Sequence, residues 1–223
     1  MSTWPRAWLD RHLRIRKRHE GPLVPPRWTE TVAMFALCTV VICTTYFGLV
    51  PHNTQLLRSG HPFLCPTTAL DGMLPFVPQF IWAYLSMYVL FVLPLLFIPA
   101  ANMPALGRQL IAGCVISAAI FLLLPAELGF MRQVPRSHAA IYAGMFNIDR
   151  PYNLVPSLHV IWSTAIVMAC ADFARPAMRV ALLAWLCVIV ASTVLVHQHH
   201  LLDVIAALAI VFFLRRQYEV LHA

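Results

Sequence analysis

The sequence predicts an all-α polytopic membrane protein in which six transmembrane helices form a bundle. Hydrophobic residues make up 60% of its 223 residues and charged residues only 11%, a balance typical of integral membrane proteins. Apolar stretches of about the length that a bilayer requires recur along the chain. Most Lys and Arg residues lie on one side of these stretches. We therefore expect a single membrane domain, with no second folded unit.

Residues 1–30 form a basic segment ahead of the first apolar stretch. Seven of the sixteen Lys and Arg residues lie within the first 27 positions. Such a cluster beside a membrane span is typical of a topology signal that faces an anionic cytoplasmic leaflet. The sequence thus predicts the lipid bilayer as partner and no nucleic acid. No cleavage signature follows the segment, so we expect no removed signal peptide.

The membrane domain is expected to cover residues 31–216. Residues 31–50 carry no charge and are long enough for a helix to cross about 30 Å of hydrocarbon. Residues 51–75 are rich in proline, glycine and polar side chains, which predicts a loop. The other spans are expected at 77–100 with a kink at Pro94, 109–125, 159–171, 180–196 and 204–214. The last span is long enough only if its helix begins near Gln198.

Six spans place both termini on one side of the membrane. The N-terminal segment, the turns near Arg108 and Arg175, and the pair Arg215–Arg216 hold twelve Lys and Arg residues, and the opposite loops hold four. The positive-inside rule then predicts that both termini, including the tail 217–223, are cytoplasmic in a cell inner (plasma) membrane. The loop 126–156 and the cluster 197–203 would both face the periplasm or the exterior.

Two polar clusters lie at the predicted external ends of apolar stretches, where ionisable residues are functional candidates. The first is Pro156-Ser157-Leu158-His159, and the second runs from His197 to Asp203. His199 and Asp203 are four residues apart, so on a helix they share a face and the carboxylate can orient the imidazole. A histidine held in this way suits a nucleophile or general base, and His159 would then be the acid.

Further residues of the same face favour an anionic substrate. Ser157 stands at an expected helix start, where free backbone N–H groups and the helix dipole attract anions. Arg132, Arg136 and Arg150 add fixed positive charge. Together with the histidines and the carboxylate, these residues predict a phosphate-ester site that works through a phosphohistidine intermediate.

The same motifs resemble those of a known family. Pro156-Ser-Leu-His159, followed by Ser192-x6-His199-x3-Asp203, is similar to the second and third signature motifs of the type 2 phosphatidic acid phosphatase superfamily. The longer stretch from Asp149 to His159 resembles the branch that contains inositol phosphorylceramide synthases and related bacterial membrane phosphatases. The resemblance covers residues 125–210.

This resemblance implies a six-helix membrane core and metal-independent phosphoryl transfer on a lipid phosphate, with no cofactor. It also implies the roles of four residues: His199 as nucleophile, Asp203 as its partner, His159 as general acid and Ser157 as a phosphate ligand. The first family motif, Lys-x6-Arg-Pro, has no match here, and Thr193 stands where the third motif usually has arginine. The site is therefore expected to hold fewer cations than the family norm and to rely more on Arg132 or Arg136.

Other interpretations of these residues stay open. A zinc site is one, because histidine and aspartate at helical spacing are acceptable ligands. Its ligands would be His197, His199, His200 and Asp203. Otherwise His197 and His200 are expected to pack or contact substrate, and Asp149 with Arg150 to form a local turn and ion pair.

The alternatives to an enzyme are a transporter and a catalytically degenerate relative that only binds a lipid headgroup. For an enzyme, the sequence leaves open whether it is a hydrolase or a headgroup-transferring synthase of the inositol phosphorylceramide synthase type. The lipid substrate and the oligomeric state are also not determined by it.

Overall fold

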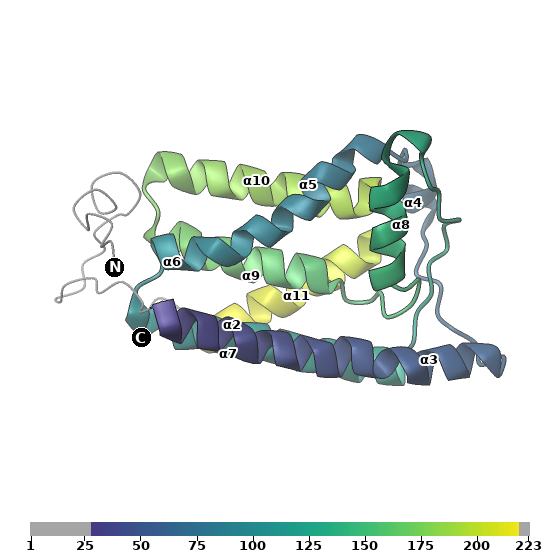
Figure 1. Cartoon of the computed structure of the whole chain (residues 1–223), viewed down its shortest axis with the longest axis horizontal. Coiled ribbons are helices and arrows are strands. Elements are labelled where there is room, and N and C mark those ends of the chain that lie inside the picture. Colours follow the sequence, from purple (N-terminus) through teal and green to yellow (C-terminus); the bar gives the residue numbers. More distant parts are fainter. Residues whose placement is uncertain (1–27, 219–223) are drawn as a thin grey trace.

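The computed structural model describes residues 28–218, and this part of the chain is helical, without a β-strand (Figure 1). The predicted tail beyond Tyr218 and residues 1–27 of the basic segment lie outside the described residues. The helices are α2 (Trp28–Ile42), a π-helical segment (Cys43–Phe47), α3 (Gly48–Arg58), α4 (Ala69–Met73), α5 (Ile81–Leu85), α6 (Leu93–Phe97), α7 (Met103–Leu123), α8 (Ala139–Ile148), α9 (Leu158–Phe173), α10 (Pro176–Leu195) and α11 (Leu201–Tyr218). Short 3₁₀ segments are Pro78–Phe80, Ser86–Val92, Ala100–Asn102 and Arg136–His138.

Four helical stretches of the described chain are long and apolar enough to cross a membrane. They are Trp28–Arg58, Pro78–Phe97, Ala100–Leu123 and Pro176–Leu195. The prediction of an all-α protein with membrane-spanning helices is confirmed at this level. Of the two other predicted spans, α9 is an apolar helix of 16 residues, and α11 has 18 residues, among them Asp203, Arg215 and Arg216.

The first helical stretch is longer than the sequence predicted. Residues 51–58 were expected in a loop, but they continue the helix as part of α3, with Pro51 inside it. The π-helical segment precedes Pro51, and the hydroxyls of Thr44 and Thr45 donate hydrogen bonds to backbone carbonyls of the preceding turn. The π-helical segment ends at Phe47, whose carbonyl the ring of Pro51 would meet in a regular α-helix, and the helix continues past Pro51.

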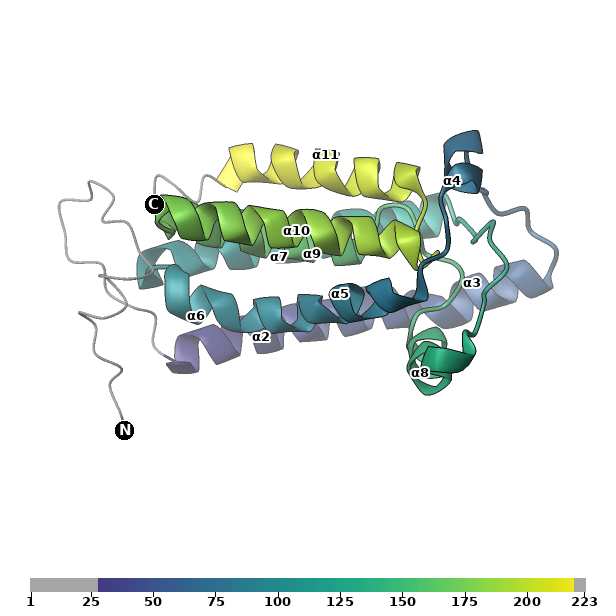
Figure 2. The same ribbon diagram turned by 90° about the horizontal axis from the view of Figure 1, so that it is seen from above.

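Helix α9 forms the centre of the bundle. Of its 16 residues, 14 are buried, and it packs against α6, α7, α10 and α11. Small side chains such as Ser163 and Ala169 let neighbouring backbones approach closely. Gly113 of α7 lies at one such close approach, because a Cβ atom at this position would be only 2.8 Å from the side chain of Ile161. The long helices run along a common axis, and α2 lies at the periphery with only Thr31 and Cys38 buried (Figure 2).

The two ends of the bundle carry different structural elements. The first residues of α9 and α11 lie at the end where α4 and α8 gather, and α2 begins at the opposite end (Figures 1 and 2). At that opposite end, Arg215 of α11 forms a salt bridge with the nearly buried Asp172 of α9. The predicted loop 126–156 is partly helical, because it contains α8. It is tied to loop 59–68 by backbone pairing between Leu64 and Ala126.

Candidate active site

The two polar clusters of the sequence meet at the beginning of α9 and α11. His159 Nδ1 lies 3.2 Å from His199 Nε2, and His199 Nδ1 lies 3.1 Å from Asp203 Oδ2. Asp203 is fully buried and His199 nearly so. Three side chains that the sequence selected thus form one continuous chain of contacts. Because the Asp203 carboxylate accepts a hydrogen bond from Nδ1 of His199, the lone pair of a neutral His199 ring lies on Nε2.

His199 lies in the turn before α11, because the helix begins at Leu201. The expectation that both His199 and Asp203 belong to the first turns of a helix is therefore wrong for His199. Asp203 Oδ2 accepts a hydrogen bond from the backbone N–H of His200 at 2.9 Å, which fixes the carboxylate across the helix start. The same oxygen therefore both caps α11 and orients the imidazole.

The segment that contains α4 supplies a second carboxylate to the start of α11. The buried Asp71 caps α4 together with Thr68, and its other oxygen accepts from the backbone N–H of Leu201 at 2.8 Å. Burial alone would raise the pKa of Asp71, but the hydrogen bonds from Thr68 and Leu201 outweigh it and lower that pKa. Asp71 thereby fixes the helix that carries Asp203, a role that the sequence did not indicate because the two are far apart in the chain.

Ser157 is the N-cap of α9. Its Oγ accepts from the backbone N–H of Val160 at 3.3 Å, and its own N–H donates to the Asp203 carbonyl at 3.2 Å. The side chain is fully buried and does not line the pocket beside the histidines. Ser157 therefore joins the start of α9 to α11, which sets the distance between His159 and His199.

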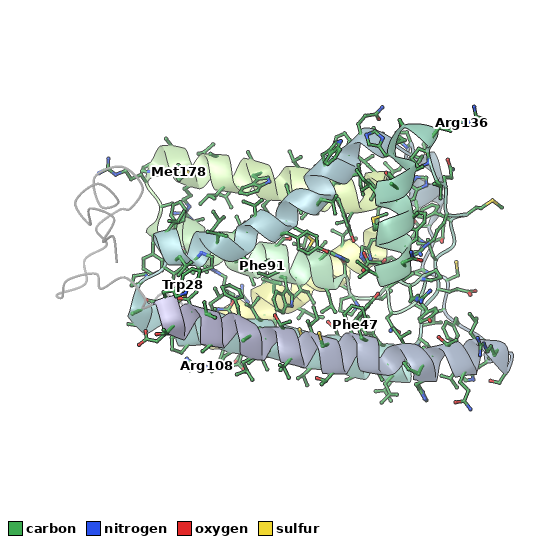
Figure 3. All side chains as sticks on the ribbon, in the orientation of Figure 1. Trp28, Phe47, Phe91, Arg108, Arg136 and Met178 are labelled. Atoms are coloured by element: carbon green, nitrogen blue, oxygen red, sulfur yellow. The ribbon has the colours of Figure 1, made fainter. Side chains whose placement is uncertain are left out.

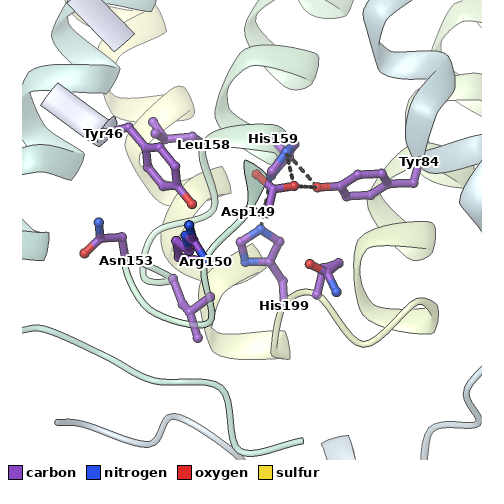
Figure 4. A pocket seen from close by; sticks show the side chains of 10 residues that line it. Tyr46, Tyr84, Asp149, Arg150, Asn153, Leu158, His159 and His199 are labelled. Carbon is purple, nitrogen blue, oxygen red and sulfur yellow. Dashed lines mark hydrogen bonds and ion pairs between the residues drawn. The ribbon is translucent and has the colours of Figure 1, made fainter. Parts of the chain in front are cut away.

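His159 is held on its second nitrogen by residues outside the predicted set. Its Nε2 lies 2.7 Å from the Tyr84 hydroxyl, which donates to Asp149 Oδ2 at 2.8 Å (Figure 4). Asp149 Oδ2 is also 3.6 Å from His159 Nε2. Among the described residues, Asp149 makes its ion-pair contact with His159 and not with Arg150, contrary to the expected local pair.

The three predicted arginines have three different environments. Arg132 packs its guanidinium over the ring of Phe146 and donates to the carbonyls of Phe146 and Asp149, so it caps the C-terminus of α8. Burial lowers the pKa of this guanidinium, and Asp149 opposes that shift. Arg136 is exposed at the outer edge of the molecule (Figure 3). Only Arg150 lies on the pocket wall with His159 and His199.

The pocket itself is small and mixed in character. Its cavity volume is about 20 Å³, and it lies between residues 149–154, the start of α9 and the segment Gln198–His199 (Figure 4). Tyr46 and Tyr84 complete its walls. Asn153 and Gln198, which the sequence analysis did not select, also face it.

His197 and His200 turn away from this pocket. Their rings stack on Phe130 at centroid distances of 4.4 and 4.9 Å. His200 Nε2 lies 2.9 Å from Thr67 Oγ1, and His197 Nε2 lies 3.3 Å from the Leu74 carbonyl oxygen. Both residues pack against loops, one of the two roles expected of them. Within residues 28–218 no three His, Cys, Asp or Glu side chains are placed to hold one metal ion, so the four proposed zinc ligands do not converge.

A second, apolar cavity opens beside the first. It has a cavity volume of about 260 Å³ and shares Tyr46, Asp149, Leu158 and His159 with the histidine pocket. Its remaining walls come from α2, the π-helical segment, the 3₁₀ segment Ser86–Val92, Ile148 and Trp162. We call it the lateral groove. A further cavity, lined by Trp28, Phe35 and Leu95 among others, continues along α2 and shares Thr39 and Phe91 with the groove.

Comparison of the chain with protein-family models, with curated proteins and with solved structures found no match.

Proposed function

We propose that this protein is an integral membrane enzyme of the type 2 phosphatidic acid phosphatase superfamily, which cleaves or transfers a phosphate ester of a lipid through a phosphohistidine. The observation that carries the proposal is the chain from Asp203 through His199 to His159 at a pocket wall. This chemistry requires a nucleophilic imidazole, a carboxylate that orients it and a second imidazole that acts as the acid. Here Asp203 contacts Nδ1 of His199, and His159 lies beside Nε2.

The hydrogen bonds of the site support an acid role for His159. Ionised carboxylates only accept, so Tyr84 donates to Asp149 and His199 Nδ1 donates to Asp203. The Tyr84 oxygen then accepts from His159 Nε2. The contact between His159 Nδ1 and His199 Nε2 is a hydrogen bond when His159 Nδ1 carries a proton. In the proposed reaction that proton is the one that the leaving oxygen receives.

The proposed reaction has two steps. His199 Nε2 attacks phosphorus, the bond from phosphorus to the leaving oxygen breaks, and His159 Nδ1 gives its proton to that oxygen. His159 then takes a proton from a water molecule, or from a lipid or polyol hydroxyl, as that oxygen attacks the phosphohistidine and releases His199. Water gives hydrolysis, and an alcohol gives transfer. Asp203 balances the positive charge that develops on His199.

The lateral groove favours a lipid as substrate. It is lined by apolar and aromatic side chains, and it reaches His159 and Asp149 at one end. An acyl chain in the groove would place a phosphate near the histidines, and its apolar surface would match the walls.

We further propose that α9 and α11 also cross the membrane, so that six spans place both termini in the cytoplasm and the site outside. The bias of Lys and Arg residues supports this orientation, as does the common position of the two helix starts. Labelling of intact cells with a membrane-impermeant maleimide tests it. In a background in which the exposed Cys65 is replaced by serine, Met131→Cys, at the site end, should react, and Arg179→Cys, in the first turn of α10, should react only after lysis. The reverse pattern would contradict the orientation.

The activity is tested with purified protein in detergent and a panel of lipid phosphates, scored for released phosphate and for new lipid products. We expect turnover of at least one lipid, and a loss of about 10⁴-fold or more in kcat for His199→Gln. His61→Gln, in an exposed loop, is the matched control and should keep full activity. Substantial activity of His199→Gln on every lipid turned over would refute the proposal.

A further inference from the structure

Two buried amide groups beside the histidines have no acceptor for their nitrogen atoms among residues 28–218. They are Asn153 Nδ2 and Gln198 Nε2, and both side chains line the histidine pocket. Asn153 is 3% exposed and Gln198 is 4% exposed. A buried donor without an acceptor is destabilising, and such groups in native proteins usually bind a ligand or water. Two of them on one pocket wall can both donate to an acceptor that lies in the pocket.

Both amides stand on segments with a fixed backbone. Asn153 has φ 65°, in the left-handed region, where asparagine is one of the favoured residues. Its side-chain oxygen accepts a hydrogen bond from Asn53, which leaves the nitrogen as its free group. Gln198 directly precedes the nucleophile, and the backbone N–H groups of Gln198 and His199 both donate to the Thr193 carbonyl at 3.1 Å. The Gln198 amide is thereby held beside the proposed nucleophile.

The pocket wall is otherwise short of cationic groups. Arg150 is the single Lys or Arg side chain that lines it in the described part of the chain. Arg132 is engaged with α8, and Arg136 lies at the outer edge. Phosphate oxygens accept hydrogen bonds only, and neutral amide donors can satisfy them where cations are absent.

We propose that Asn153 Nδ2 and Gln198 Nε2 bind non-bridging oxygens of the phosphoryl group that His199 attacks, together with Arg150, the one Lys or Arg side chain that lines the pocket within residues 28–218. This inference rests on the proposed function and adds two substrate-binding residues to it. The amides occupy the role that lysine and arginine would otherwise fill, so binding of the phosphoryl group depends on directed donors more than on net charge.

The test uses orthovanadate, which presents the same kind of oxygens and requires no knowledge of the lipid. Its Kd is measured by titration calorimetry on the full-length protein in detergent. Gln198→Leu removes one donor, and Asn153→Gly removes the other without adding a charge, at a left-handed φ that glycine tolerates. Asn53 keeps its hydrogen bond to the Phe121 carbonyl in that variant. The matched control is Gln109→Leu, because Gln109 is 2% exposed and its nitrogen likewise lacks an acceptor within residues 28–218, yet it lies on α7 outside the pocket.

We expect each pocket variant to bind orthovanadate about tenfold or more weakly, and Gln109→Leu to stay within about twofold of the unmodified protein. Thermal unfolding of each variant identifies those that remain folded. Unchanged affinity in both folded pocket variants would overturn the amide assignment and leave the phosphohistidine proposal intact. Amide-dependent binding with neither phosphate release nor transfer from any lipid would support the assignment and contradict the proposed catalysis. Absence of binding, release and transfer in the unmodified protein would contradict both.

Discussion

Tyr84→Phe tests how the site holds its acid. The hydroxyl of Tyr84 joins His159 Nε2, at 2.7 Å, to Asp149 Oδ2, at 2.8 Å, and the side chain is buried. Removal of the hydroxyl takes away both hydrogen bonds and leaves the volume of the ring in place. Hydrogen bonds to charged groups contribute about 1.5–3 kcal/mol, and each 1.4 kcal/mol in the barrier is about tenfold in rate. We therefore expect kcat to fall about 10- to 150-fold, with little change in KM.

The assay is initial-rate kinetics on the lipid that is turned over fastest. Tyr142→Phe is the matched control, because Tyr142 is a buried tyrosine that donates one hydrogen bond, to the Pro78 carbonyl, and lies outside the pocket. A double-mutant cycle with Asp149→Asn isolates the coupling, and we expect the double variant to lose less than the sum of the single losses. If folded Tyr84→Phe keeps kcat within twofold of the unmodified enzyme, the account of how His159 is oriented is refuted.

Four further substitutions test binding and stability separately. Arg150→Ala should raise KM about tenfold or more in kinetic assays and leave the melting temperature unchanged, whereas Arg132→Ala should lower the melting temperature because it removes the cap of α8. Asp71→Asn should cost about 1.5–3 kcal/mol in denaturant unfolding at pH 7. Because the folded pKa of Asp71 lies below its usual value, this stabilisation is present at neutral pH and is lost as pH falls through that pKa, so the difference should disappear in acid. Gly129→Ala should destabilise the protein by about 1–3 kcal/mol in the same measurement, since its Cβ would lie 1.9 Å from Thr67 Oγ1.

The sequence predicted the parts of the site that local spacing determines. His199 and Asp203 are close in the chain, and a topology counted from basic residues was sufficient to place His159 on the same face. The structure brings these three residues together. Four of the six predicted spans correspond to helical stretches that are long and apolar enough to cross a bilayer, a property that length and composition determine.

Contacts between distant segments could not be predicted in this way. Nothing in the helix that carries Tyr84 indicates that its hydroxyl meets a histidine 75 positions later. Arg132 and Arg150 have the same charge, and only the fold decides that one caps α8 while the other lines the pocket. Of the pocket residues that the sequence analysis did not select, Asn153 was the one that the sequence could have indicated, because it lies inside the stretch that resembles a family motif.

The most direct test of the central claim is detection of the phosphorylated residue. The protein is mixed with the lipid phosphate that is turned over fastest, quenched within milliseconds in alkali, and digested for mass spectrometry. The account predicts an acid-labile phosphoryl group on His199, absent from His199→Gln and retained by the His61→Gln control. Turnover with no phosphoryl group on His199, or with the group on another residue, would contradict the account.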